Sequence, residues 1–221
     1  MSQTPLRIEI AAGLGTGKTT AAQVLANAGL SQDIESHAHN PFIEAFYQDP
    51  VHYAFETEMT FLMQHYHDMK NRLVRCHAEN TPAIVFDYSL LLDRAYADVT
   101  LTNKQNQGFA AAYEAAKHEI GRPDILIHLE CNTPQQMQRI RERGREIEQG
   151  IPADYIEQLA QATRNAIARE PDYARRIITV DTTARDLRHN ADDQNAFTRY
   201  LHQNIKSLKD NTPGYKPPTP G

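Results

Sequence analysis

The chain has 221 residues, 40% of them hydrophobic and 23% charged, which fits a single α/β domain with one sizeable core. Its formal net charge of −5 argues against partners such as nucleic acid polymers or membrane surfaces, which bind proteins by general electrostatic attraction. No apolar run is long enough to span a bilayer, residues 1–5 do not resemble a signal peptide, and Cys76 and Cys131 lack disulfide or metal-site spacing. These features predict a soluble, cytoplasmic enzyme.

The most informative stretch comes first, at residues 7–20, which read RIEIAAGLGTGKTT. The pattern predicts a short strand, a glycine-rich turn and the start of a helix. Glycines allow backbone N–H groups to converge on an anion, the helix N-terminus adds a positive dipole end, and Lys18 can reach the outer phosphates of a nucleotide. A glycine-rich turn that binds no nucleotide is the alternative, because Ala12 stands where the phosphate-loop motif has its first glycine. The residues expected to hold ATP phosphates are Gly13, Gly15, Gly17, Lys18, Thr19 and Thr20, with Mg²⁺ on the Thr19 hydroxyl.

The next part of the chain predicts helices with proline near their starts. A helix is expected over residues 19–28 and a weak strand or extended segment over 30–35. Asn40-Pro41 predicts a short helix over 42–47, with Asn40 as its N-cap and Pro41 in its first position. Asp49-Pro50 repeats the signal and begins a long helix that runs to about residue 76.

Three further strands alternate with helices in the second half. Apolar runs predict buried strands at 82–87, 124–129 and 176–181. Helices are expected after Ser89, over 103–120, from Asn132 into an arginine-rich stretch, over 151–169 and over 190–208. We therefore expect one domain over residues 1–208 and a disordered proline-rich tail over 209–221.

Strands alternating with helices predict an α/β protein with a doubly wound parallel sheet of five strands flanked by helices. Ligands of such sheets bind beyond the carboxyl ends of the strands. Asp87, at the carboxyl end of the third strand, therefore stands where a catalytic or metal-binding acid would lie.

Four arginines recur at every second position from 139 to 145, with Gly144 interrupting them. On one helix this spacing cannot place all four on one face. The pattern predicts a helix that runs into a loop carrying Arg143 and Arg145 toward one anion, as a lid over residues 139–150 closing on a phosphoryl group would. An exposed basic helix end is the alternative.

Four stretches resemble the deoxynucleoside kinase family, whose members phosphorylate the 5′-hydroxyl of deoxyribonucleosides with ATP. Residues 35–42 resemble the family's E-P-V-x-x-N-P segment, and residues 46–55 its F-Y-x-D-P…Y-A-F pattern. Asp87-Tyr88-Ser89 stands at its D/E-R-S motif, and residues 139–152 are very similar to its lid and the segment that follows. The resemblance covers about four-fifths of the chain and implies the P-loop kinase fold of that family. It also implies that the protein uses ATP and Mg²⁺ as cofactors and forms a homodimer.

The resemblance also implies roles for individual residues. Glu35 would be the general base that takes the proton of the 5′-hydroxyl, and Asp87 would hold Mg²⁺ with Thr19. Residues 181–187, starting at Asp181, would surround the adenine of ATP. The expected catalytic residues are Glu35, Lys18, Arg139, Arg143 and Arg145, and the expected substrate contacts are Asp87, Asp93 near the base, Glu58, and Tyr47 with Glu148 at the sugar 3′-hydroxyl.

The chain departs from the family pattern in four places. Ala11-Ala12 replaces the usual Glu-Gly, Tyr88 replaces an arginine, and His65 replaces an arginine that pairs with the acid at position 93. Glu58 replaces the glutamine that reads the base. Because a carboxylate only accepts hydrogen bonds, it matches the adjacent N1–H and 2-amino donors of guanine, so we expect a preference for deoxyguanosine or a related 2-aminopurine nucleoside.

Two other functions stay open on the sequence. Tyr88 and Ala12 are compatible with a catalytically impaired pseudokinase that only binds a nucleoside or nucleotide. A nucleoside monophosphate kinase is the other alternative, although that class needs an extra cation for the acceptor phosphate, whereas Glu35 suits a neutral hydroxyl.

Overall fold

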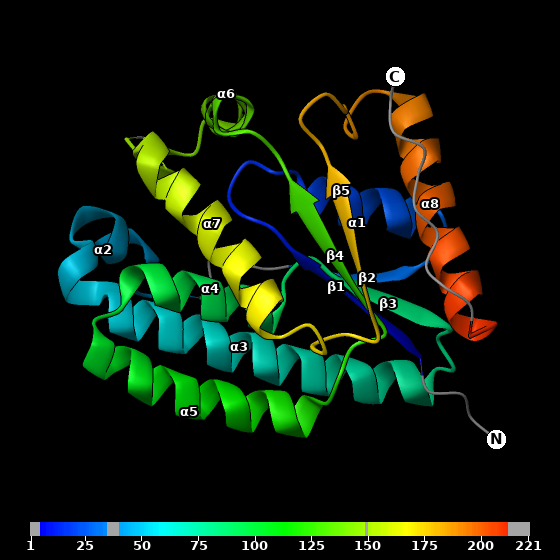
Figure 1. The fold of residues 1–221 in the computed structure, drawn as a ribbon, viewed down its shortest axis with the longest axis horizontal. Coiled ribbons are helices and arrows are strands. Elements are labelled where there is room, and N and C mark those ends of the chain that lie inside the picture. The colour runs from blue at the N-terminus through cyan, green and yellow to red at the C-terminus, as the bar shows by residue number, and fades with distance from the viewer. Residues whose placement is uncertain (1–4, 35–39, 149, 212–221) are drawn as a thin grey trace.

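The computed structural model describes residues 5–34, 40–148 and 150–211. They form a three-layer α/β arrangement in which helices cover both faces of one sheet (Figure 1). The strands are β1 (Leu6–Ala11), β2 (Ser31–Asp33), β3 (Ala83–Phe86), β4 (Ile125–Glu130) and β5 (Arg176–Asp181). The helices are α1 (Lys18–Asn27), α2 (Ile43–Gln48), α3 (Pro50–Ala78), α4 (Leu90–Thr100), α5 (Asn103–Ile120), α6 (Thr133–Arg143), the 3₁₀ turn η2 (Glu146–Glu148), α7 (Ala153–Arg169) and α8 (Ala191–Lys209).

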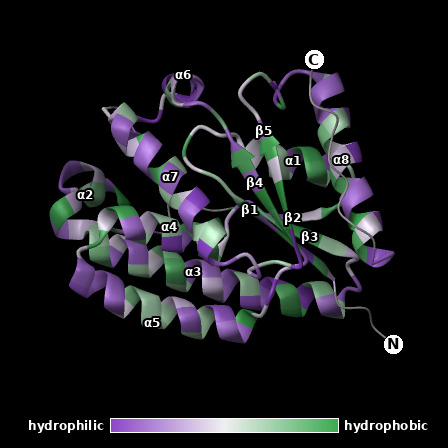
Figure 2. Cartoon of the chain, in the orientation of Figure 1, coloured by the Kyte–Doolittle hydropathy of each residue, from purple (hydrophilic) through white to green (hydrophobic). Residues whose placement is uncertain are grey.

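All five strands are parallel and lie in the order β2-β3-β1-β4-β5, which confirms the predicted α/β class and the five-stranded sheet. The first strand is central, paired with β3 on one side and β4 on the other. A parallel sheet with helices on both faces requires strands that are apolar on both sides, and β3 is buried along its whole length. Figure 2 shows the sheet as a mostly hydrophobic layer between helices with polar outer faces.

Alternate residues of β1 serve two separate cores. Ile8 and Ile10 pack with α1 and α8 on one face of the sheet. On the other face, Ala11 packs against α4 and α7, while α3 and α5 cover β3. This alternation follows from the two-residue period of a strand.

A buried polar network interrupts the second face. The Glu9 carboxylate is fully buried; it lies 3.1 Å from Arg7 Nε and accepts a 2.6 Å hydrogen bond from the Tyr173 hydroxyl. The same hydroxyl accepts a hydrogen bond of 3.3 Å from the backbone N–H of Leu91, in the first turn of α4. The network therefore links the central strand to the start of the helix that carries Asp93.

Side chains at the helix ends explain where most helices begin. Asp49, Ser89 and Asn132 each accept a hydrogen bond from a backbone N–H in the first turn of α3, α4 and α6. The predicted bounds of α5 and β5 are confirmed to the residue, and those of α3 to within two.

The prediction for the short helix α2 was wrong at its start. It begins at Ile43, not at Pro41, because Asn40 does not cap it. The Asn40 side chain accepts a hydrogen bond from Phe42 N at 3.1 Å and donates one to Thr57 O at 3.0 Å, so it closes a turn and ties that turn to α3.

The chain end gives a smaller correction. Lys209, expected to begin the tail, is the last residue of α8, and Asp210 and Asn211 form a turn after it. The rest of the predicted tail, residues 212–221, lies outside the described residues. Within the part of the chain that the structure describes, no helix has the length and apolar character needed to cross a bilayer.

The Glu9 network makes a testable prediction about stability and pH. Burial raises the pKa of Glu9 above its ordinary value of 4.5, so the folded protein holds this proton to a higher pH than the unfolded chain does. The free energy of unfolding therefore falls as the pH rises from 4.5 through the raised folded value. Replacing Glu9 with Gln removes this decline.

Urea unfolding at a series of pH values measures the effect. The difference in unfolding free energy between Glu9→Gln and wild type should move in favour of the variant as the pH rises above about 4.5. Glu44→Gln, at an exposed carboxylate on α2, controls for the loss of one charge. A difference that is constant with pH would contradict the prediction.

Candidate active site

The glycine-rich turn after β1 is shaped by the approach of α6. Gly15 has φ +72°, and a Cβ there would lie 2.6 Å from the backbone oxygen of Gln136, so neither the conformation nor the space allows a side chain. Gly17 has φ +100° and immediately precedes α1. The turn that leads into the N-terminus of α1 therefore depends on glycine at these two positions.

The Ala12 substitution fits this turn. Ala12 has no positive φ, and its methyl group is buried in the apolar cluster shared by β1 and α1. Its carbonyl accepts a hydrogen bond of 2.9 Å from Lys18 Nζ, which folds the lysine back over the turn. Position 12 thus tolerates alanine without strain in the loop.

Thr19, in the first turn of α1, and Asp87, directly after β3, are brought together by the fold. The Thr19 hydroxyl donates a hydrogen bond of 2.7 Å to Asp87 Oδ2, and Asp87 is buried at the carboxyl end of β3. A hydroxyl and a carboxylate oxygen at this separation suit Mg²⁺, which prefers oxygen ligands and keeps several waters. Elsewhere among the described residues, no three His, Cys, Asp or Glu side chains are grouped as a metal site.

A large cleft of about 830 Å³ opens above the glycine-rich turn. Its walls are the turn itself, the start of α1, α6 and residues 182–189 after β5. Lysine and arginine outnumber carboxylates along these walls, so the cleft favours a polyanion. The cations that line it are Lys18, Arg139, Arg143, Arg145, Arg185 and Arg188.

Arg139 holds two walls of the large cleft together. Its guanidinium donates hydrogen bonds to the backbone oxygens of Thr182, at 2.7 Å, and of Arg185, at 3.0 Å. A longer bond of 3.4 Å reaches Thr16 O in the glycine-rich turn. In this structure the predicted lid cation therefore joins α6 to the loop after β5 and the phosphate loop.

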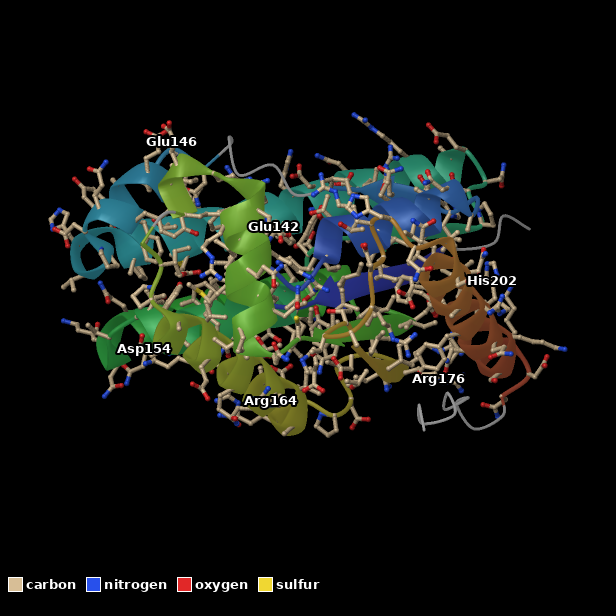
Figure 3. The ribbon with its side chains drawn as sticks, turned by 90° about the horizontal axis from the view of Figure 1, so that it is seen from above. Glu142, Glu146, Asp154, Arg164, Arg176 and His202 are labelled. Carbon is tan, nitrogen blue, oxygen red and sulfur yellow. The ribbon has the colours of Figure 1, made fainter. Side chains whose placement is uncertain are left out.

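Arg143 and Arg145 do converge on one anion, and in this structure it is a protein carboxylate. Arg143 Nε lies 3.0 Å from Glu148 Oε2, and Arg145 Nη1 lies 3.3 Å from Glu148 Oε1. Glu148 is only 3% exposed. Gly144, with φ +67°, ends α6 between the two arginines as predicted, and Figure 3 shows Glu142 on α6 and Glu146 on the turn that follows.

A small pocket of about 50 Å³ lies behind the phosphate loop. Leu14 and Lys18 line both it and the large cleft, so the lysine stands where the two meet. At this volume it holds one or two waters, and a nucleoside would require the side chains around it to move. Its other lining residues are Ile43, Phe46, Tyr47, Thr57, Glu58, Phe61, His65, Leu92, Asp93, Tyr96 and Tyr155.

Three of the sequence-predicted contacts, Tyr47, Glu58 and Asp93, line this small pocket. Glu58 accepts a hydrogen bond of 3.0 Å from the Thr100 hydroxyl. Asp93 pairs with His65, whose Nδ1 lies 2.9 Å from each carboxylate oxygen. The histidine therefore occupies the partner position that the family pattern gives to an arginine.

Tyr88 is fully buried and supplies no positive charge to the site. Its ring stacks on His65 at 4.2 Å between centroids, and its hydroxyl donates a 3.0 Å hydrogen bond to Asp33 Oδ1 at the end of β2. Burial, reinforced by the Asp33 carboxylate, raises the pKa of Tyr88 far above its usual range, so the hydroxyl stays neutral. A cation that stabilises a transferring phosphoryl group must therefore come from a residue other than the one at position 88.

Three predicted residues in the described part of the chain, Asp87, Glu148 and Asp181, are not among those that line the two cavities. Glu35, the expected general base, lies outside the described residues. Asp181 ends β5 and accepts a hydrogen bond from Thr183 N at 2.8 Å, while the wall of the large cleft starts one residue later. The predicted adenine loop of 181–187 contains Arg185 without singling it out, and sequence reasoning missed Arg188 just beyond it; their position after a predicted parallel strand was the available signal.

Comparison with known proteins identifies relatives of one kind. Residues 8–206 match a family model described as deoxynucleoside kinase. A deoxyguanosine kinase of Bacillus subtilis (strain 168) is 29% identical over 90% of this chain and 97% of its own length. A deoxyadenosine/deoxycytidine kinase of the same organism is 26% identical over 73% and 76%. Among solved structures, deoxyadenosine kinase from M. mycoides with bound dCTP has a TM-score of 0.72 at 20% identity, covering 91% of this chain and all of its own.

The pairing of two arginines with Glu148 predicts competition between this carboxylate and a bound polyphosphate. Glu148→Gln removes the anion that holds Arg143 and Arg145, so affinity for tripolyphosphate should rise at least about fivefold. Isothermal titration calorimetry measures the dissociation constant. Glu146→Gln, at an exposed carboxylate on the same turn, is the matched control and should leave affinity near the wild-type value. Equal or weaker binding by Glu148→Gln would refute the competition.

Proposed function

We propose that this chain, which belongs to the deoxynucleoside kinase family, transfers the γ-phosphoryl group of ATP to the 5′-hydroxyl of a deoxyribonucleoside and prefers guanine as the base. The observation that carries the proposal is the meeting of two cavities at Lys18, one lined by cations and the other by Glu58, Asp93 and aromatic rings. A donor nucleotide suits the first cavity and a nucleoside the second.

The donor triphosphate would bind in the large cleft. The backbone N–H groups of the glycine-rich turn and the start of α1 would hold its phosphates, and Lys18 would leave the Ala12 carbonyl for them. Residues 182–189 would surround the adenine, held in place through Arg139. Arg185 and Arg188 add positive charge along the same path.

Thr19 and Asp87 would hold Mg²⁺, the Thr19 hydroxyl giving up its hydrogen bond to Asp87. When bound, the ion neutralises charge on the β- and γ-phosphates. Family membership supports the use of ATP, and the oxygen pair supports this position for the metal.

The acceptor nucleoside would bind in the small pocket with its sugar toward Lys18. Glu35 would take the 5′-hydroxyl proton as the oxygen attacks the γ-phosphorus. Tyr47 and Glu148 would bind the 3′-hydroxyl and disfavour a 2′-hydroxyl. For Arg143 and Arg145 to stabilise the transferring group, they must exchange the Glu148 carboxylate for phosphate oxygens, a change that nucleoside and ATP together would drive.

The guanine preference rests on Glu58. A carboxylate there would accept hydrogen bonds from guanine N1–H and the 2-amino group, whereas adenine N1 and cytosine N3 would turn a lone pair toward it. Thr100 would fix the other side of the carboxylate through its hydrogen bond. The 29% identity to a deoxyguanosine kinase agrees with this base.

The proposal extends to assembly and cell biology. We expect residues 1–208 to act as one catalytic domain with a lid over 139–150, to form a homodimer through the long helices, and to serve nucleotide salvage in the cytoplasm. Met63 and Val74, exposed apolar side chains of α3, are compatible with a partner on that helix.

The general base can be tested directly. Glu35→Gln keeps the size of the side chain but cannot take a proton, so turnover should fall about 10²- to 10⁴-fold. Affinity for ATP should not change, because the base contacts the acceptor. Phosphorylation rates and ATP titrations measure the two quantities, and near wild-type turnover would show that another group acts as the base.

The base preference is tested with Glu58→Gln. An amide can match adenine or cytosine, so the ratio of kcat/KM for deoxyguanosine to that for deoxyadenosine should fall about 5- to 100-fold. Initial rates on the four deoxynucleosides measure it. Glu56→Gln, an exposed neighbour on α3, should leave the ratio unchanged. A wild-type enzyme without guanine preference, or a ratio unmoved by Glu58→Gln, would refute this part of the proposal.

A further inference from the structure

His65 is held in one orientation at the wall of the small pocket. Its ring lies between Phe61, at 5.8 Å between centroids, and Tyr88, at 4.2 Å, with both neighbours close to parallel to it. Only 5% of the residue is exposed, and Nδ1 faces both oxygens of Asp93 at 2.9 Å. Stacking on two sides and a hydrogen bond on the third leave the ring little freedom to turn.

The hydrogen bond to Asp93 also fixes what each ring nitrogen can do. An ionised carboxylate only accepts hydrogen bonds, so Nδ1 must carry a proton. The second nitrogen, Nε2, then has two states. In the neutral ring it accepts a hydrogen bond, and in the imidazolium it donates one.

Purine bases carry either a hydrogen-bond acceptor or a donor at position 6, which complements the two states of His65 Nε2. Guanine and hypoxanthine carry a 6-oxo group, which accepts a hydrogen bond, whereas adenine carries a 6-amino group, which donates one. A protonated His65 therefore matches a 6-oxopurine, and a neutral His65 matches a 6-aminopurine.

We propose that His65 reads position 6 of the purine and that the proton on its Nε2 selects between 6-oxo- and 6-aminopurine deoxynucleosides. The inference rests on the proposed function, because it places the base in the small pocket. It adds a second selecting residue to Glu58, which would read N1 and the 2-amino group instead. A mismatched hydrogen bond buried in this pocket should change relative affinity at least about fivefold.

The surroundings of His65 favour the charged ring by Coulomb attraction and oppose it by burial. Carboxyl groups from three elements lie near it: Asp93 contacts the ring, Glu58 lines the same pocket, and Glu9 lies within electrostatic reach of both His65 and Asp93. One ammonium group and three phenols line the same pocket, and a further phenol, that of Tyr88, stacks on the ring. The groups concerned are Asp93 and Tyr96 on α4, Glu58 on α3, Glu9 on β1, Lys18 on α1, Tyr47 on α2, Tyr155 on α7 and Tyr88 after β3.

The experiment measures dissociation constants for deoxyguanosine, deoxyinosine and deoxyadenosine by calorimetry between about pH 5.5 and pH 9, a range that spans histidine titration. Deoxyinosine lacks the 2-amino group, so its comparison with deoxyadenosine is independent of that contact. As the pH rises, both 6-oxopurines should lose affinity relative to deoxyadenosine, at least about fivefold across the range. Phosphorylation rates for the same nucleosides are measured alongside.

His65→Gln tests the assignment, because its amide does not titrate and should give selectivity that is flat with pH. His67→Gln, an exposed histidine on the same helix with its Nε2 at 2.8 Å from Asn71, should keep the wild-type slope. Asp93→Asn, which removes the carboxylate facing Nδ1, should move the transition to lower pH and serves if His65→Gln fails to fold. The same pH slope in His65→Gln as in wild type, or no slope in wild type, would overturn the inference.

The outcomes separate the two levels of the argument. Binding with the expected slope but without phosphorylation would refute the kinase reaction and leave the role of His65 supported. Phosphorylation with a guanine preference that Glu58→Gln abolishes, but with no pH slope, would support the proposed function and refute the role of His65.

Discussion

All five strands of the sheet run in the same direction, and this one constraint assembles the site. Loops that follow β1, β2, β3, β4 and β5 must emerge at a single edge, whatever their distance in sequence. The phosphate loop, Asp33, Asp87, α6 and residues 182–189 all lie there. Lys18 stands between the two cavities because β1 is central, with β3 on one side and β4 on the other.

Positive charge at this edge is held by protein acceptors in the structure. Lys18 is bonded to the Ala12 carbonyl, Arg139 to backbone oxygens, and Arg143 with Arg145 to Glu148. Buried or clustered cations are costly without such partners. When a phosphate ligand binds, its oxygens must therefore replace the protein oxygens that these cations contact. The affinity for phosphate then depends on the difference in strength between the new hydrogen bonds and the ones that are lost.

The departures from the family pattern form a connected set around the small pocket. Tyr88, in place of an arginine, stacks on His65, which replaces another arginine and pairs with Asp93. Two permanent charges are thus exchanged for one neutral phenol and one titratable ring. Ala12, the remaining oddity near the phosphates, sits in apolar packing at a backbone conformation that alanine adopts freely. These substitutions lie around the small pocket, where we propose that the acceptor binds, and leave the phosphate loop intact.

The amino-acid sequence by itself determined the order of elements, the parallel sheet and the phosphate loop, because these depend on local periodicity and on turn residues. The capping residues Asp49, Ser89 and Asn132 act within one helical turn, so their positions could be read directly. The tertiary structure decided which charges meet, although the family resemblance had already indicated two of these pairs. The pairing of His65 with Asp93 spans 28 positions and that of Thr19 with Asp87 spans 68. Over such separations, local sequence patterns do not determine how two side chains are oriented toward each other. The partner of Arg143 and Arg145, although close in sequence, depends on how the chain turns after Gly144 and on the burial of Glu148 against its neighbours.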